Sequence, residues 1–237
     1  AYTLRSHAVT TLWLTSGLFQ TMVDEHLEAM TGVRNLLAGG DVLSIPHLRR
    51  AMTAMPSTRF VNGYGPTENT TFTTCHTITS DDLLRPSVPI GKPIPNSTVL
   101  ILDHEKRQVP VGIEGELYTG GDGLAIGYLN DAERTASVFT NLSGLGRVYR
   151  TGDRARWRDD GSIEFLGRWD RQVKIRGVRV EPSEIEVALL THPKVAEARA
   201  GTRGRSAAAK TLVAWVRLNG KIDRDELTDY LAAKLPT

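Results

Sequence analysis

A glycine-bracketed aromatic loop is the stretch of this sequence best suited to chemistry. It reads Asn62-Gly63-Tyr64-Gly65-Pro66-Thr67-Glu68. The glycines let the backbone approach a ligand closely, and the tyrosine ring between them is able to stack on a planar group. The Thr67 hydroxyl suits a phosphate, and Glu68 supplies a hard oxygen ligand for Mg²⁺. The same residue types also fit a tight turn that caps a helix, so both interpretations stay open at this point.

A second candidate is the aspartate that ends the run Tyr149-Arg150-Thr151-Gly152-Asp153. We expect a Thr-Gly turn to hold the Asp153 carboxylate, whose two oxygens can accept hydrogen bonds from both hydroxyls of a ribose. The alternative is a surface turn in which the aspartate bonds its own backbone.

Cations are concentrated in the run Gly-Arg-Trp-Asp-Arg-Gln-Val-Lys-Ile-Arg-Gly, from Gly167 to Gly177. Guanidinium groups such as that of Arg168 pair well with nucleotide phosphates. A solvated hairpin would carry the same residues, so the composition alone leaves two possibilities.

Short apolar runs and helical stretches must position the first loop. The runs lie at 9–14, 36–38 and 59–62, with helical spacing at 18–30 and a second helix expected after Ser44 as its cap. Strands that alternate with helices form parallel sheets, so residues 1–85 are predicted to be the α/β part of a large subdomain. Ligands usually sit at the carboxyl ends of such strands, where the Tyr64 loop lies.

The pattern changes near residue 86. Pro and Gly separate short strand-like runs at 98–102, 116–119 and 162–166, with one or two helical turns near 131–139. This spacing is typical of antiparallel sheets, so we expect residues 86–169 to form a distorted β-barrel or sheet.

The last part of the chain, 170–237, is predicted to be a small α+β unit. Its expected elements are a hairpin around Arg176-Gly177, a helix from Pro182, a strand at 212–218 and a helix capped by Asp223 with Glu226. The expected fold class is therefore α/β: the end of a large N-terminal subdomain, with a parallel sheet and then a distorted β-barrel, followed by a small mobile C-terminal subdomain.

Composition narrows the class of protein. Of the 237 residues, 40% are hydrophobic and 24% charged, which is ordinary for a globular protein, and the net charge of +2 is too small for a nucleic-acid or membrane surface. The single cysteine, Cys75, excludes an internal disulfide framework, fits a reducing cytoplasmic compartment and is expected to be a packed residue rather than a nucleophile. No apolar run is long enough to cross a bilayer. The chain starts at Ala1 without a leader, so we expect it to be part of a longer polypeptide.

Five ordered motifs resemble the core motifs of the adenylate-forming superfamily, which holds nonribosomal peptide synthetase adenylation domains, acyl-CoA ligases and luciferases. The resemblance runs from near Thr10 to Thr237, and the loops around Tyr64 and Lys174 are most similar to the peptide-synthetase branch. The motifs are Tyr-Gly-Pro-Thr-Glu at 64–68, Gly-Glu-Leu-Tyr-Thr-Gly-Gly at 115–121, Tyr-Arg-Thr-Gly-Asp at 149–153, the basic run at 167–177 and Glu184-Ile185-Glu186.

The resemblance implies a role for each matched residue. It implies that Tyr64 stacks on adenine, that Asn62 bonds the adenine amino group and that Asp153 binds the ribose hydroxyls. Thr67 and Glu68 are the implied catalytic residues: Thr67 contacts the α-phosphate and Glu68 holds Mg²⁺. The remaining implied positions are Arg168 at the ribose or phosphate, Gly40, Gly63 and Gly65 around the nucleotide, and Asp170 as the hinge of the small subdomain.

The resemblance also implies a substrate pocket and partners. The pocket wall would come from residues matching Gly17, Leu37, Gly39, Gly63, Thr71 and Phe72, whose three glycines favour a mid-sized or bulky acid. The implied reaction activates a carboxylic acid, with an amino acid favoured, using ATP and Mg²⁺. The acyl group then passes to the phosphopantetheine thiol of a peptidyl carrier protein. An MbtH-like protein is a candidate accessory partner, and neither nucleic acid nor a membrane is expected.

Three departures from the family pattern keep alternatives open. The Gly-rich phosphate loop is absent, and Lys221, in Asn219-Gly220-Lys221-Ile222-Asp223, is expected to be a decoy for the family's catalytic lysine because the Leu-Pro motif that should precede it starts only at Leu235. Ile126 stands where the family usually has Arg. An acyl-CoA or aryl-CoA ligase therefore remains an alternative, as does an inactive fragment that only binds nucleotide.

Overall fold

The computed structural model describes residues 1–175, 177–204 and 209–235, so the expectations for Arg176 and for Pro236-Thr237 lie outside the described residues. The chain divides into two compact units, Ala1–Trp169 and Asp170–Thr237. In the described part of the chain, no helix combines the length and apolarity needed to cross a membrane.

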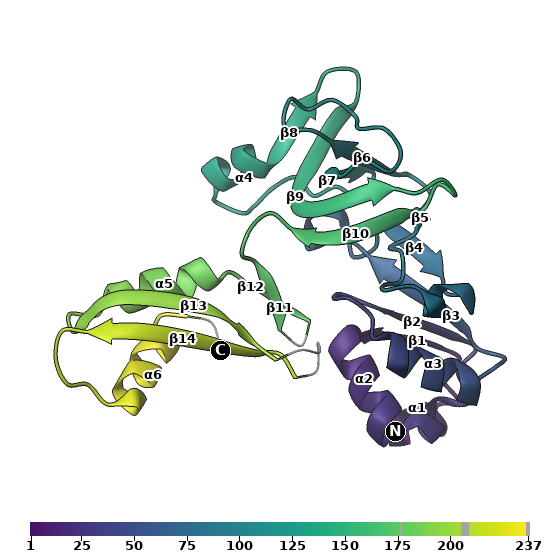
Figure 1. Ribbon diagram of the computed structural model, residues 1–237, viewed down its shortest axis with the longest axis horizontal. Coiled ribbons are helices and arrows are strands. Elements are labelled where there is room, and N and C mark those ends of the chain that lie inside the picture. Colours follow the sequence, from purple (N-terminus) through teal and green to yellow (C-terminus); the bar gives the residue numbers. More distant parts are fainter. Residues whose placement is uncertain (176, 205–208, 236–237) are drawn as a thin grey trace. The chain divides into compact units, whose positions relative to one another are not determined.

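The first unit begins with a helix and a mixed sheet (Figure 1). Strands β1 (Thr11–Thr15), β2 (Asn35–Gly39) and β3 (Arg59–Tyr64) are parallel and in the order β1-β2-β3, as the sequence predicts. Strands β4 (Thr74–Thr77) and β5 (Lys92–Pro93) extend this sheet in the antiparallel sense. The helical elements are α1 (Tyr2–Ser6), α2 (Ser16–Glu25), η1 (Leu27–Met30), α3 (Ile45–Ala54), η2 (Thr67–Asn69) and η3 (Asp81–Leu84).

The two faces of the β1–β3 sheet differ. Leu14, Leu36 and Phe60 point to the face that packs against helices α2 and α3, where burial of apolar area stabilises the fold. On the opposite face Trp13 stays 38% exposed and Leu37 is only partly buried. The alternation of side chains along a strand therefore separates a core face from a face that remains accessible in this chain.

Local details of this sheet differ from expectation. Ser44 does stand at the N-cap of α3, but its hydroxyl bonds His47 Nδ1 at 2.6 Å instead of a backbone N–H. The helical run at 18–30 is divided into α2 and the short η1. The strand-like run before His76 starts only at Thr74, because Thr70 and Thr71 have positive φ angles of 41° and 62°.

A second, antiparallel sheet completes the first unit, as predicted. Its strand order is β10-β9-β7-β6, with β8 added on β9. Backbone hydrogen bonds join it to the first sheet, from Ile90 N to Ile163 O and from Ile163 N to Gly91 O, both at 2.8 Å. The elements are β6 (Ser97–Leu102), β7 (Gly115–Gly121), α4 (Ala132–Val138), β8 (Phe139–Leu142), β9 (Gly146–Trp157) and β10 (Ile163–Arg168).

The second unit is the expected α+β structure. Buried Ile185 and Leu189 of α5 pack with Val195 and Ala200 of β13 in its core. Strand β13 is the element that the sequence did not reveal, because its charged residues and alanines lack the β-branched character of a typical strand. The elements are β11 (Val173–Ile175), β12 (Val178–Val180), α5 (Pro182–Leu190), β13 (Val195–Arg203), β14 (Thr211–Leu218) and α6 (Arg224–Ala232).

Candidate active site

Three side chains from distant segments meet beyond the carboxyl end of the parallel strands. The Tyr64 hydroxyl donates a hydrogen bond to Asp153 Oδ2, and Arg168 Nη1 lies 2.5 Å from Asp153 Oδ1. Tyr64 ends β3, Asp153 lies within β9 and Arg168 ends β10. The three motifs singled out in the sequence are thus brought together in one place, which we call the Tyr64–Asp153–Arg168 cluster.

An irregularity in β9, rather than the expected turn, positions Asp153. Between the pairs Glu116–Arg154 and Tyr118–Arg150, β9 holds three residues where β7 holds one, and Gly152 there has a φ of 76°. Such a bulge re-aims side chains. Thr151 fastens it, since its hydroxyl donates to Leu117 O at 2.7 Å and accepts from Asp153 N at 3.0 Å. Asp153 is 7% exposed, so the surface-turn alternative is wrong.

The charges and protonation states of the three side chains suit the binding of a ligand through its neutral hydroxyl groups. Burial, together with the adjacent Asp153 charge, raises the pKa of the Tyr64 phenol well above its usual value, so Tyr64 remains a donor at neutral pH. The Arg168 guanidinium offsets the Asp153 charge and also donates to Thr151 O at 2.9 Å. An ionised carboxylate has about four lone-pair positions. A carboxylate can therefore accept hydrogen bonds from several donors at once, and Tyr64 and Arg168 are two of those that Asp153 contacts.

The loop that follows β3 packs closely against residues 71–73, which lead into β4. A Cβ on Gly65 would lie 2.5 Å from Thr71 O, so only glycine fits there. Asn62 is buried and its Nδ2 donates to Pro89 O at 2.8 Å, while Thr67 is exposed at the start of η2. The loop thus carries Tyr64 and the exposed, hydroxyl-bearing Thr67 on a backbone that glycine packing and the Asn62 hydrogen bond hold in place.

Glu68, the predicted metal ligand, is buried in η2 and accepts a hydrogen bond from the Tyr128 hydroxyl at 2.5 Å. Over residues 1–175, 177–204 and 209–235, no group of three or more His, Cys, Asp and Glu side chains is arranged to hold a metal ion. Mg²⁺ often binds through one or two carboxylates together with substrate phosphates. The donor set of this chain fits a magnesium ion shared with a nucleotide and does not fit an all-protein metal site.

Four of the predicted pocket residues lie on or against the accessible face of the parallel sheet, namely Leu37, Gly39, Gly63 and Phe72. Gly39 and Gly63 are register partners, and Phe72 packs against both Gly63 and Trp13. A Cβ on Gly63 would lie 2.4 Å from Phe72 Cε1, and one on Gly39 would overlap the Gly63 carbonyl oxygen and lie 3.1 Å from the Trp13 ring. The space beside these glycines is therefore filled by neighbouring backbone and aromatic rings instead of being left empty, which corrects the reason given for a bulky substrate.

With this geometry in view, a comparison with protein families is decisive. Residues 2–129 match the family described as AMP-binding enzyme. The chain belongs to this family. The match covers β1 to β7, including the Tyr64 loop, Glu68 and the aromatic pair Trp13–Phe72, and it confirms the adenylate-forming resemblance read from the motifs.

Curated relatives are similar to this chain over nearly its full length, beyond the part that matches the AMP-binding family. One of the linear gramicidin synthase proteins of Brevibacillus parabrevis is 51% identical over 97% of this chain and 3% of its own length. Tyrocidine synthase 3 of the same organism is 44% identical over 98% of this chain and 4% of its own length. Among solved structures, holo-PA1221, an NRPS protein containing adenylation and PCP domains bound to vinylsulfonamide inhibitor, is 40% identical with a TM-score of 0.90, covering 98% of this chain and 41% of that one. The chain thus spans a small part of these curated relatives.

Sequence reasoning missed Trp13, which stands beside Phe72 with ring centroids 4.9 Å apart. The only signal in the sequence was a tryptophan within a short predicted strand, β1. Trp13 stands two residues before Thr15, the register partner of Gly39. Gly17, another of the predicted pocket residues, is buried near the start of α2, a helix that packs on the core face of the sheet. Gly40 lies just beyond β2 with a φ of 77°, a conformation that favours glycine.

The predicted hinge residue Asp170 is the first residue of the second unit, where its Oδ1 accepts from Gln172 N at 3.1 Å. Lys221 lies in the exposed turn between β14 and α6, as the sequence predicts.

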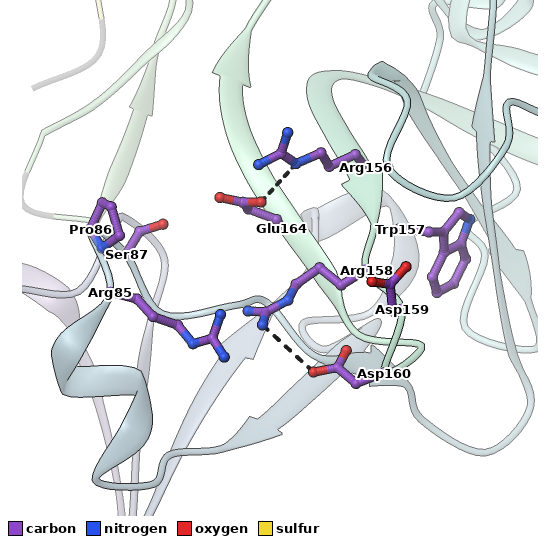
Figure 2. Close-up of a pocket in the computed structure, with 10 residues that line it drawn as sticks. Arg85, Pro86, Ser87, Arg156, Trp157, Arg158, Asp159, Asp160 and Glu164 are labelled. Atoms are coloured by element: carbon purple, nitrogen blue, oxygen red, sulfur yellow. Dashed lines mark hydrogen bonds and ion pairs between the residues drawn. The ribbon is translucent and has the colours of Figure 1, made fainter.

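A cavity of about 490 Å³ opens beside the β9–β10 hairpin of this AMP-binding chain, and no predicted site residue lines it. Figure 2 shows Arg156 paired with Glu164, Arg158 reaching Asp160, and Arg85 on the other side. Its charged residues, three arginines and three carboxylates, balance one another. The cavity therefore contributes nothing to the cluster described above.

Proposed function

We propose that the protein containing this chain activates a carboxylic acid, with an amino acid favoured, by joining it to AMP with release of pyrophosphate. The single observation that carries this proposal is the Tyr64–Asp153–Arg168 cluster, in which an aromatic ring, a carboxylate and a guanidinium from three segments adjoin one another. An adenosine presents a planar base, a ribose diol and a phosphate, which are the groups that these three side chains recognise.

Each residue has a defined part in the proposal. Tyr64 stacks on adenine, Asn62 bonds its amino group through Oδ1, and the Asp153 carboxylate accepts hydrogen bonds from the ribose hydroxyls. Arg168 holds the carboxylate and reaches the ribose or phosphate side. Thr67 contacts the α-phosphate, and the glycines Gly40, Gly63 and Gly65 allow close backbone approach.

The chemistry needs positioning and charge neutralisation rather than a protein nucleophile. A carboxylate oxygen of the substrate attacks the α-phosphorus in line, a new O–P bond forms, and pyrophosphate leaves with the electrons of the broken bond. Glu68 would hold Mg²⁺ against the phosphates, and the bound ion supplies neutralisation of their charge. The exposed Thr67 at the start of η2 orients the α-phosphate for this attack.

The acid would lie against the accessible face of the parallel sheet, near Leu37, Gly39 and Thr71. Trp13 and Phe72 give this region two aromatic rings, which favours an acid with an apolar side chain. We place this reaction in the cytoplasm, since the chain has a single cysteine.

The second half-reaction would transfer the acyl group to the phosphopantetheine thiol of a peptidyl carrier protein, with rotation of the small unit about Asp170. The relative holo-PA1221 contains adenylation and PCP domains, which supports this acceptor. An MbtH-like protein is included as an accessory partner of the proposal.

The test is ATP–pyrophosphate exchange by the purified protein that contains this chain, across a panel of acids. We expect exchange with a bulky apolar acid and little with glycine or alanine. Mass spectrometry then compares loading of a carrier protein with formation of an acyl-CoA. Absence of exchange with every acid contradicts adenylate formation, and an acyl-CoA product alone contradicts the carrier-protein step.

A further inference from the structure

The loop that precedes α4 fastens the short helix η2, which carries Glu68. Ala125 N donates to Glu68 O at 2.9 Å, and the Thr70 hydroxyl donates to Gly123 O at 2.7 Å. These bonds join residues more than 50 positions apart and hold the two segments side by side. The Glu68 side chain is therefore fixed by residues outside its own loop.

Tyr128 ends this loop and reaches the Glu68 carboxylate directly. Its hydroxyl donates to Glu68 Oε1 at 2.5 Å, a charge-assisted bond to a carboxylate that is only 7% exposed. A carboxylate held in this way keeps one orientation, because rotation would break a hydrogen bond in a site with little water to replace it.

Tyr128 is itself held on three sides. Its backbone N–H donates to Thr135 Oγ1 at 2.9 Å, its ring packs edge-on against Phe139 at 5.9 Å, and the Arg134 guanidinium lies 4.6 Å over the ring centroid. Gly127 allows the close approach, since a Cβ there would lie 2.5 Å from Thr135 Cγ2. These contacts with residues at and around α4 fix the position of the Tyr128 ring, and with it the hydroxyl that bonds Glu68.

A further contact anchors the other end of the loop. Arg147 of β9 donates to the carbonyl oxygens of Ala125 and Ile126 at 2.7 and 2.5 Å. The Ile126 side chain is 94% exposed, so the backbone of this residue, not its side chain, ties the loop to the sheet. Hydrogen bonds therefore connect β9 to the loop, and the loop to Glu68.

We propose that Tyr128 is a positioning residue that orients the Glu68 carboxylate for the divalent cation bound with ATP. This inference rests on the proposed function of Glu68. Hydrogen-bonding partners of metal ligands typically alter metal affinity by about 10–100-fold when removed. The Tyr128 hydroxyl stands in that relation to Glu68, so its loss should weaken cation binding while the residues that contact the acid and the base stay in place.

The deciding variant is Tyr128→Phe, which keeps the ring contacts with Phe139 and Arg134 and removes only the hydroxyl. We expect the Mg²⁺ concentration for half-maximal pyrophosphate exchange to rise by about 10-fold, with the rate restored at saturating Mg²⁺ and the KM of the acid unchanged. Binding of Mn²⁺ followed by electron paramagnetic resonance, with α,β-methylene-ATP present, should weaken by a similar factor. This second readout does not depend on turnover.

Two further variants complete the experiment. Tyr118→Phe is the matched control, because the Tyr118 hydroxyl bonds a different glutamate, Glu116 of the same strand β7; it should leave the Mg²⁺ dependence unchanged. Thr135→Val removes the acceptor of the Tyr128 N–H and should shift the Mg²⁺ requirement in the same direction, by less. It serves if Tyr128→Phe does not fold.

The outcomes separate the two proposals. A wild-type protein without exchange contradicts adenylate formation itself. An active wild type whose Tyr128→Phe variant keeps the normal Mg²⁺ half-saturation and the normal Mn²⁺ affinity contradicts the role of Tyr128 alone, as does a variant that loses only thermal stability.

Discussion

The phenol of Tyr64 and the carboxylate of Asp153 are joined by a hydrogen bond although 89 positions separate them in the chain. Tyr64 ends a parallel strand of the first sheet, and Asp153 lies at a bulge in the second. The bond therefore links the two sheets at the place where three sequence motifs meet. The proposed adenosine site depends on this junction, and the expected effects of mutation follow from it.

Replacement of Asp153 by asparagine should weaken ATP recognition and remove the negative charge with which Arg168 pairs. Hydrogen bonds to charged groups contribute about 1.5–3 kcal/mol each, so kcat/KM for ATP should fall by at least about 10-fold. Pyrophosphate exchange at varied ATP measures this. Glu164→Gln is the control, because Glu164 of β10 is also paired with an arginine, Arg156 at 2.8 Å, outside the cluster. Equal losses in both variants would argue against a specific role for Asp153.

The Tyr64 ring and the Tyr64 hydroxyl should have separable effects. Tyr64→Ala removes the stacking surface, and base–aromatic stacking contributes about 1–3 kcal/mol, so the KM for ATP should rise by roughly 10–100-fold. Tyr64→Phe keeps the ring and should raise that KM only a few-fold. The kinetic comparison is made at saturating acid. If Phe and Ala variants were equally impaired, the ring would not be the element that recognises adenine.

Gly63→Ala should disturb the acid side of the site. The new methyl group would overlap Phe72, whose Cε1 lies 2.4 Å from the Cβ position, and overpacking of this kind costs about 1–3 kcal/mol. We expect a higher KM for the acid, or a changed acid preference. Gly32→Ala is the control, because no atom lies within 4 Å of its Cβ position. An unchanged acid preference in Gly63→Ala would place the acid elsewhere.

The second unit should lose stability in acid through Glu186. Arg171, followed by the Ala200 N–H, lowers the pKa of this carboxyl below its usual value. A lowered pKa means that the carboxylate stabilises the fold above its unfolded-state pKa, and that this stabilisation is lost as pH falls through the lower folded-state value.

Urea denaturation of wild type and Glu186→Gln at several pH values tests this expectation. The variant should be less stable at pH 7, and the difference should shrink as the pH falls below about 4.3. Glu197→Gln is the control, since the Glu197–Arg217 pair is largely exposed and should contribute little. A stability difference for Glu186→Gln that grows on acidification would contradict the sign.

Local patterns were enough to predict much of this fold. The apolar runs at β1, β2 and β3 with helices between them indicated a parallel sheet, and Val173-Lys174-Ile175 with Val178-Arg179-Val180 indicated a hairpin, because each depends on neighbouring residues alone. The resemblance of motifs identified the family before the fold was known.

What the sequence could not reveal depends on long-range packing. Asp153 was expected in a turn because Thr151-Gly152 has turn composition, whereas its pairing with Arg168 of β10 keeps it in a strand, next to the bulge opposite β7. The Tyr128–Glu68 bond joins residues 60 positions apart, and no local pattern announces it. Trp13 was passed over because its importance appears only when β1 and Phe72 are seen together.

The most direct test of the central claim is a crystal structure of the protein that contains this chain with AMP bound. The account predicts that the ribose hydroxyls lie within hydrogen-bonding distance of the Asp153 carboxylate and that the adenine ring stacks on Tyr64, with Arg168 on the ribose or phosphate side. An AMP molecule bound at any other place, with the Tyr64–Asp153–Arg168 cluster not in contact with it, would contradict the account.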